Sequence, residues 1–124
     1  MNKDLNYIQE TLVKMMKAHE PLLRARVDTE KQLEMQGTIE AMQGKKKVDG
    51  YYFGSVIPKP KDVRLYFFPI YTHVDHFEDI PEALRKFLKG KSCFHIKYLD
   101  DDIEVAINKM ITKGVELYKA DNLI

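Results

Sequence analysis

Two apolar stretches separated by a double-proline segment constrain the fold of this chain more than any other feature. Residues 51–57 and 63–70 are rich in aromatic and β-branched side chains, which favour β-strands. The segment Pro-Lys-Pro-Lys-Asp between them, residues 58–62, predicts a turn because prolines cannot donate hydrogen bonds to a sheet. Since this connection is short, we expect the two strands to pair as an antiparallel hairpin at the centre of a sheet.

The alternation of side chains along this hairpin predicts apolar residues on both of its faces. We expect one face to carry Tyr51, Phe53, Ile57, Leu65 and Phe67, and the other to carry Tyr52, Val56, Tyr66, Phe68 and Ile70. A sheet with one face in water normally alternates apolar and polar residues. The second face is therefore expected to be covered by another segment of the chain, by a second protomer or by a ligand.

Hydrophobic periodicity predicts helices at both ends of the chain. Apolar residues recur at helical spacing over residues 3–18 and again from about 103 to 120. Carboxylates at Asp100 and Asp102 fit the N-terminus of the second helix, where the helix dipole favours negative charge.

Three shorter elements complete the prediction. Period-two alternation indicates strands over residues 33–41 and 91–98, and Pro81 and Gly90 indicate the start and end of a short helix near 81–89. The expected fold is a single α+β domain over residues 1–124. Its central antiparallel β-sheet is packed with the N-terminal and C-terminal helices and the short helix.

Composition narrows the class of protein. The 124 residues include 20 basic and 19 acidic side chains, so the net charge of +1 gives no reason to expect nucleic acid as a partner. The longest apolar run, residues 65–71, is too short to span a membrane, and no signal peptide is visible. With Cys93 as the only cysteine, a cytoplasmic protein is expected. We find no nucleophile-elbow, phosphate-loop or dinucleotide motif, which favours binding over catalysis.

The segments GYYFGSVIP, VRLYFFPIYTH and IPEALRKFLKGKSCFHIKYLD, followed by GVELY, resemble the YdhG-like family, a domain of unknown function. The resemblance covers residues 49–118 and is most specific at residues 89–94, whereas residues 34–42 lack the Trp-Gly-Met-Pro-like stretch of many relatives. It implies an α+β fold with a central antiparallel sheet. One distant branch is linked to frataxin-like iron delivery, and the resemblance supplies no catalytic residues.

Our leading hypothesis places a ligand or a protomer on the aromatic sheet face. The residues expected there are Tyr52, Tyr66, Phe68, Cys93 and His95. Cys93 and His95 share one strand face, with Cβ atoms about 7 Å apart. Flanking lysines are expected to lower the pKa of the thiol, which leaves a thiol-dependent enzyme as a further hypothesis. The alternative is a small buried cysteine beside an ordinary surface histidine.

A His-x-x-His segment supports an alternative hypothesis, in which the protein binds iron or another metal transiently and holds no permanent cofactor. Its candidate ligands are His73, Asp75, His76 and Glu78. A polar connector leading into the Pro81 helix explains the same residues without a metal ion, because a metal site needs three or four ligands in a fixed geometry.

Overall fold

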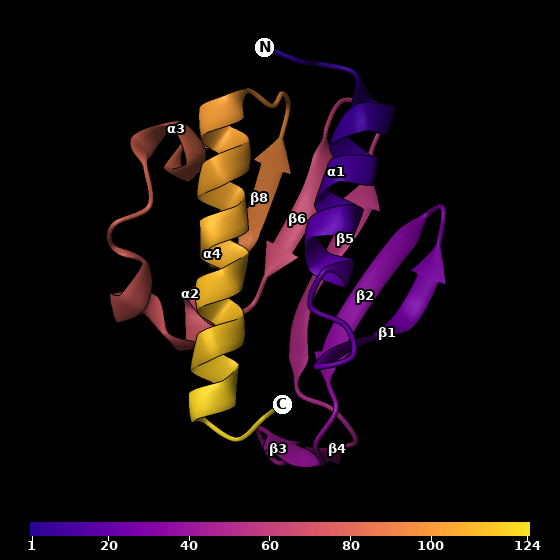
Figure 1. The fold of residues 1–124 in the computed structure, drawn as a ribbon, viewed down its shortest axis with the longest axis vertical. Coiled ribbons are helices and arrows are strands. Elements are labelled where there is room, and N and C mark those ends of the chain that lie inside the picture. The colour runs from indigo at the N-terminus through magenta and orange to yellow at the C-terminus, as the bar shows by residue number, and fades with distance from the viewer.

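The computed structural model describes all residues from 1 to 124 and has one six-stranded antiparallel sheet with two long helices on one face (Figure 1). The chain forms, in order, α1 (Leu5–Lys17), β1 (Leu23–Thr29), β2 (Gln32–Gly37), β3 (Ala41–Gln43), β4 (Lys46–Val48), β5 (Tyr52–Pro58), β6 (Val63–Phe67), α2 (Pro69–Thr72), a 3-10 helix (Val74–Phe77), α3 (Glu82–Arg85), β7 (Leu88–Lys89), β8 (Cys93–Ile96) and α4 (Asp101–Ala120). The strand order is β1-β2-β5-β6-β8-β7, and β3 and β4 form a separate hairpin. The predicted α+β fold is confirmed.

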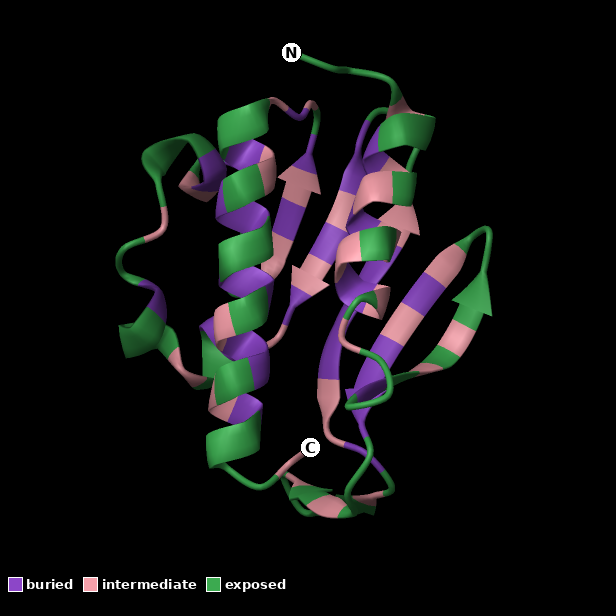
Figure 2. Ribbon diagram, in the orientation of Figure 1, coloured by how far each residue is buried: buried purple, intermediate pink, exposed green.

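Both terminal helices form where the sequence predicts them, and both are capped by an aspartate. Asp4 accepts hydrogen bonds from the first-turn amides of α1, and Asp100 accepts one of 2.8 Å from the Ile103 amide in α4. One stripe of each helix is buried against the sheet, as Figure 2 shows. No helix has an apolar run long enough to cross a membrane.

The central hairpin is confirmed, with Ser55 opposite Tyr66 and Val56 opposite Leu65. Strand β6 ends at Phe67, three residues earlier than predicted, because Pro69 begins the short helix α2.

The predicted assignment of faces within β5 is wrong, because the strand contains a bulge. Met35 pairs with Gly54 and Gln36 pairs with Tyr52, which leaves Phe53 as an extra residue. The bulge breaks the period-two alternation, so Phe53 and Val56 both lie in the core beneath the helices. Residues C-terminal to the bulge therefore face opposite to the prediction.

The short helix near 81–89 is also shorter than predicted. Helix α3 ends at Arg85, and Leu88 pairs with Phe94 in a new edge strand, β7. Gly90, expected to end the helix, instead lies in the turn between β7 and β8 with a φ of 71°. A left-handed residue is needed in this turn, which a glycine supplies without strain.

The strand predicted over residues 33–41 divides into two elements. Strand β2 ends at Gly37, and the chain then leaves the sheet to form the β3–β4 hairpin, whose turn contains Gly44 at a φ of 64°. The C-terminal segment approaches closely at this point and requires a glycine, because a Cβ at Gly37 would lie 2.4 Å from the Leu123 carbonyl oxygen.

The two lateral edges of the sheet are formed by β1 and β7. Strand β1 contains a second bulge, at Arg26, and its exposed side chains include Arg24 and Arg26. Strand β7 is only two residues long. Neither edge offers a long, flat, apolar strand.

Candidate binding site on the open sheet face

The sheet face opposite α1 and α4 is covered by no helix (Figure 1). We call it the open face. One row of directly paired residues crosses it through all six strands, and we call this the central row: Val27, Glu34, Ser55, Tyr66, Cys93 and Lys89. Their neighbours along the strands, such as Leu65 and Phe94, are buried against the helices. The open face is thus the side of the sheet that points away from the helices. Only the side chains of the face itself shield its middle from water.

The structure brings the five predicted ligand-binding residues together on this face. Tyr66 and Cys93 lie in the central row. His95 lies two residues after Cys93 in β8 and is paired with Arg64. Tyr52 and Phe68 form an aromatic pair with ring centroids 5.5 Å apart. Whether they bind a ligand stays a prediction, but their common location no longer depends on an assumed register.

The open face is less apolar than the sequence predicted. Because the bulge at Phe53 reverses the later part of β5, Val56 lies in the core and Ser55 lies on the open face. Arg64 joins them from β6. Charged and hydroxyl groups are therefore interspersed with the aromatic rings, and of these groups tyrosine, phenylalanine and arginine are the types enriched in protein–protein interfaces.

Arg64 and Asp62 form a polar centre that the sequence reasoning missed. The Arg64 Nε donates a 2.7 Å hydrogen bond to Asp62 Oδ1, and this bond raises the pKa of the guanidinium further above its ordinary range. The Asp62 side chain is only 8% exposed. Arg64 alternates with the buried residues Val63 and Leu65, and this outward polar position was the available signal.

His95 lies beside this centre, with its Nδ1 3.9 Å from Asp62 Oδ2. Burial and the positive charge of Arg64 lower the pKa of the imidazole from 6.5, although Asp62 acts in the opposite direction. The side chain is therefore mainly uncharged at neutral pH, and it can donate or accept a hydrogen bond.

Tyr52 is held in place by two neighbours. Its hydroxyl lies 2.7 Å from the Ser55 hydroxyl, and its ring packs against Phe68. Burial raises the pKa of the Tyr52 phenol to about 12, so the group stays protonated at physiological pH. A fixed, uncharged phenol of this kind offers a rigid contact surface with little conformational entropy to lose on binding.

The Cys93 thiol differs from its prediction. Burial raises the pKa of the thiol, and this effect outweighs the opposing influences of Tyr66 and Arg64. The lysine nearest in sequence on the same strand face, Lys91, lies with its ammonium group 5.2 Å from the centre of the Tyr71 ring. The expected lowering by flanking lysines is therefore wrong, since desolvation of a half-buried thiol exceeds the effect of cations that stay in water.

This environment predicts slow alkylation of Cys93. At pH 7.5 we expect iodoacetamide to modify the folded protein several times more slowly than the same chain unfolded in urea, because a raised pKa leaves less thiolate. The rate should still be rising with pH where an ordinary thiol has reached its plateau. Mass spectrometry of timed samples measures both rates, and a folded-state rate equal to or above the unfolded rate would contradict the prediction.

The four residues proposed as metal ligands do not form such a site. His73 lies with Nε2 2.6 Å from Asp121 Oδ2 and Nδ1 2.7 Å from the Thr72 hydroxyl, so both ring nitrogens already have partners. The other three, Asp75, His76 and Glu78, are exposed. No group of three or more His, Cys, Asp or Glu side chains in the structure is placed to hold a metal ion.

A hollow of about 420 Å³ opens beside Tyr52, between the sheet and the β3–β4 hairpin. Its walls are mainly polar and include Arg26 and Glu34, which form an ion pair of 2.7 Å, together with the buried amide of Gln36. The Gln36 amide donates to Asp49 at 3.3 Å. Most of the charged groups in this hollow therefore have partners within the chain, with Lys46 as the exception.

Comparison with protein-family models, with curated proteins and with solved structures found no match to this chain.

Proposed function

We propose that this protein is a non-enzymatic binding module of the YdhG-like type, which pairs with a second copy of itself through the open face. The observation that supports this proposal is a sheet face without helical cover on which aromatic residues, Cys93 and His95 lie half-buried side by side. Apolar surface of this kind gains stability when a partner removes it from water.

The flat shape of the face favours a macromolecular surface over a small molecule. A small-molecule site usually encloses most of its ligand. The open face instead extends over six strands, a width of about 24 Å at the usual strand spacing. With strand lengths of about 20 Å, two copies would bury roughly 1,000 Å² in total, which is near the lower limit for a specific interface.

The central row is also complementary to itself when its order is reversed. A two-fold axis parallel to the strands, between β5 and β6, would place the large Tyr66 ring of one copy over the small Ser55 of the other. The same operation would place Cys93 opposite Glu34 and Lys89 opposite Val27 of the second copy. The feature of the row that supports this arrangement is therefore the pairing of a large side chain with a small one beside the axis.

Sedimentation velocity tests the proposal. Over a concentration series from about 5 to 500 µM we expect a monomer–dimer equilibrium with a dissociation constant of about 10–100 µM, because the buried area is small. Tyr66→Lys should weaken the dimer at least tenfold by placing two ammonium groups beside the axis. Near-UV circular dichroism confirms that the variant is folded.

The matched control is Tyr7→Lys, since Tyr7 is an exposed tyrosine of α1 on the other side of the sheet. It should leave the dissociation constant unchanged. A wild-type protein that stays monomeric at 500 µM refutes the proposal, as does a dimer that Tyr66→Lys leaves intact.

A further inference from the structure

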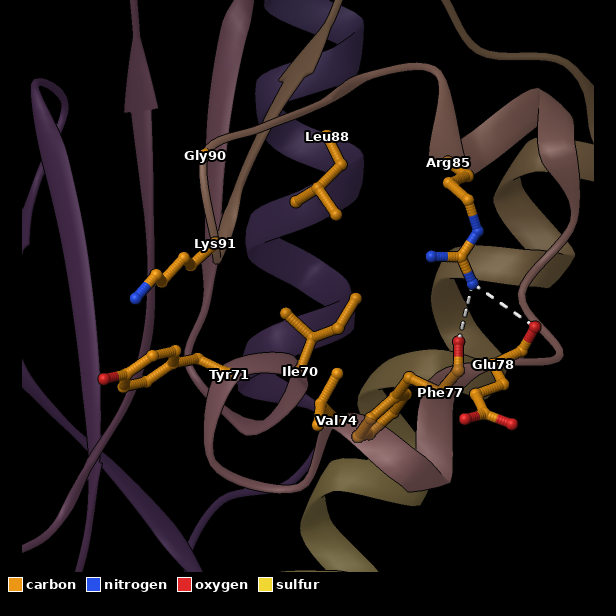
Figure 3. A pocket seen from close by; sticks show the side chains of 9 residues that line it. All are labelled: Ile70, Tyr71, Val74, Phe77, Glu78, Arg85, Leu88, Gly90 and Lys91. Atoms are coloured by element: carbon orange, nitrogen blue, oxygen red, sulfur yellow. Dashed lines mark hydrogen bonds between the residues drawn. The ribbon is translucent and has the colours of Figure 1, made fainter.

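A second site adjoins one border of the open face, where α2 and the 3-10 helix approach α3 and β7. A cavity of about 620 Å³ opens there, within the usual range for small-molecule sites. Its apolar wall consists of Ile70, Val74, Phe77 and Leu88. Figure 3 shows Ile70, Val74 and Leu88 converging on the middle of the cavity, with Arg85 on one side.

Arg85 is the charged group of this cavity, and it is held rigidly. One terminal nitrogen, Nη2, donates to the Phe77 carbonyl at 2.9 Å and to the Glu78 carbonyl at 3.3 Å. In Figure 3 the other terminal nitrogen points towards the apolar side chains. The side chain is half-buried, yet none of the ion pairs in the chain involves it.

The half-buried guanidinium has no carboxylate partner in the chain, so its remaining N–H groups are open to an anion. The two carbonyl bonds fix the plane of the group before any ligand arrives, so little entropy is lost when its free N–H groups donate to a carboxylate. The carboxylate of Glu78 is exposed, so no carboxylate of the chain occupies the place beside the free N–H groups of Arg85.

The apolar part of the cavity is also incompletely covered. Val74 is 61% exposed, although it borders the buried residues Ile70 and Phe77. Tyr71 is 49% exposed at the opposite rim, where the Lys91 ammonium group lies over its ring. A ligand with an apolar body would cover Val74, and its acidic group would meet Arg85.

We propose that this cavity binds a small monocarboxylic acid with an apolar body. The carboxylate accepts hydrogen bonds from the free donors of Arg85, and the body of the acid packs on Val74, Ile70 and Leu88. This binding site does not depend on the proposed dimer, because none of its lining residues belongs to the central row.

Titration with sodium octanoate, followed by ¹H–¹⁵N NMR spectroscopy, tests this inference. We expect saturable shifts in the amides of residues 70–78 and 85–91, with a dissociation constant below about 1 mM. Octan-1-ol and octylammonium chloride should bind at least tenfold more weakly, because they cannot accept paired hydrogen bonds from a guanidinium.

Val74→Glu adds a negative charge at an exposed position and should weaken octanoate binding at least tenfold. Val105→Glu is the matched control, since Val105 is 56% exposed on α4 and lies outside the cavity. It should bind octanoate like the wild type. The inference is overturned if octanoate shows no saturable shifts at 5 mM, if the shifts lie elsewhere, if octan-1-ol binds equally well, or if Val74→Glu binds like the wild type.

Discussion

Replacing Gly54 by alanine is expected to lower the free energy of unfolding by about 3 kcal/mol. Gly54 lies where α1 presses on the central hairpin, and an added Cβ would fall 2.3 Å from the Tyr66 carbonyl oxygen and 2.7 Å from the Met16 Cε. The methionine end can move, but the carbonyl belongs to the neighbouring strand. The substitution must therefore push β5 and β6 apart or shift the helix.

Urea unfolding followed by far-UV circular dichroism measures this effect. Gly44→Ala is an informative comparison, because a Cβ there meets nothing within 4 Å but the residue has a φ of 64°. Only backbone strain should then appear, about 1 kcal/mol. Equal losses in the two variants would show that the contact at Gly54 is not the cause.

Tyr118→Ala is expected to cost about 4 kcal/mol of stability, because the ring is among the largest side chains that the fold buries completely. The ring meets Phe53 edge-on, with centroids 5.3 Å apart, and its hydroxyl donates a 2.6 Å hydrogen bond to the Tyr52 carbonyl. Burial raises the pKa of this phenol, so the hydroxyl remains a donor at physiological pH.

Tyr118→Phe separates the two contributions. It keeps the ring and removes only the hydrogen bond, so we expect a loss of about 1 kcal/mol. Thermal and urea unfolding of the two variants measure both values. A phenylalanine variant as unstable as the alanine variant would assign the stabilisation to the hydroxyl and contradict the packing argument.

The terminal helices and the central hairpin could be predicted because their signals are local. The apolar stripe of α1, with Ile8, Leu12 and Met16 buried, is visible in the sequence at helical spacing. The hairpin is marked by the two prolines of its turn. Strand β1 also alternates apolar and polar residues, but its bulge at Arg26 places Val27 on the face opposite to Leu23 and Ala25.

The remaining differences arise from interactions between distant segments. The bulge at Phe53 arises where β5 pairs with β2 on one side and with β6 on the other. The pattern of residues within β5 alone does not indicate it. Strand β7 has two residues, which is too few for any periodicity. Its pairing with Phe94 is set by the fold around it.

The candidate site was predicted in outline. Cys93 and His95 were placed on one face correctly because β8 has no bulge between them. Arg64 and Asp62 were missed, since the alternation argument considered only the apolar residues of β6. The cavity around Arg85 was also missed, because it is formed by α2, the 3-10 helix, α3 and β7, which come together only in the folded chain.

The two edge strands of the sheet also bear on the size of the proposed assembly. On the β1 side, a kinked backbone and two guanidinium groups oppose the addition of another strand, and on the far side β7 is too short to template one. Both flanks therefore disfavour lateral growth into an open-ended fibre. Association through the broad surface of the sheet uses that surface up in a single step, so such an assembly is finite and ends with the pair.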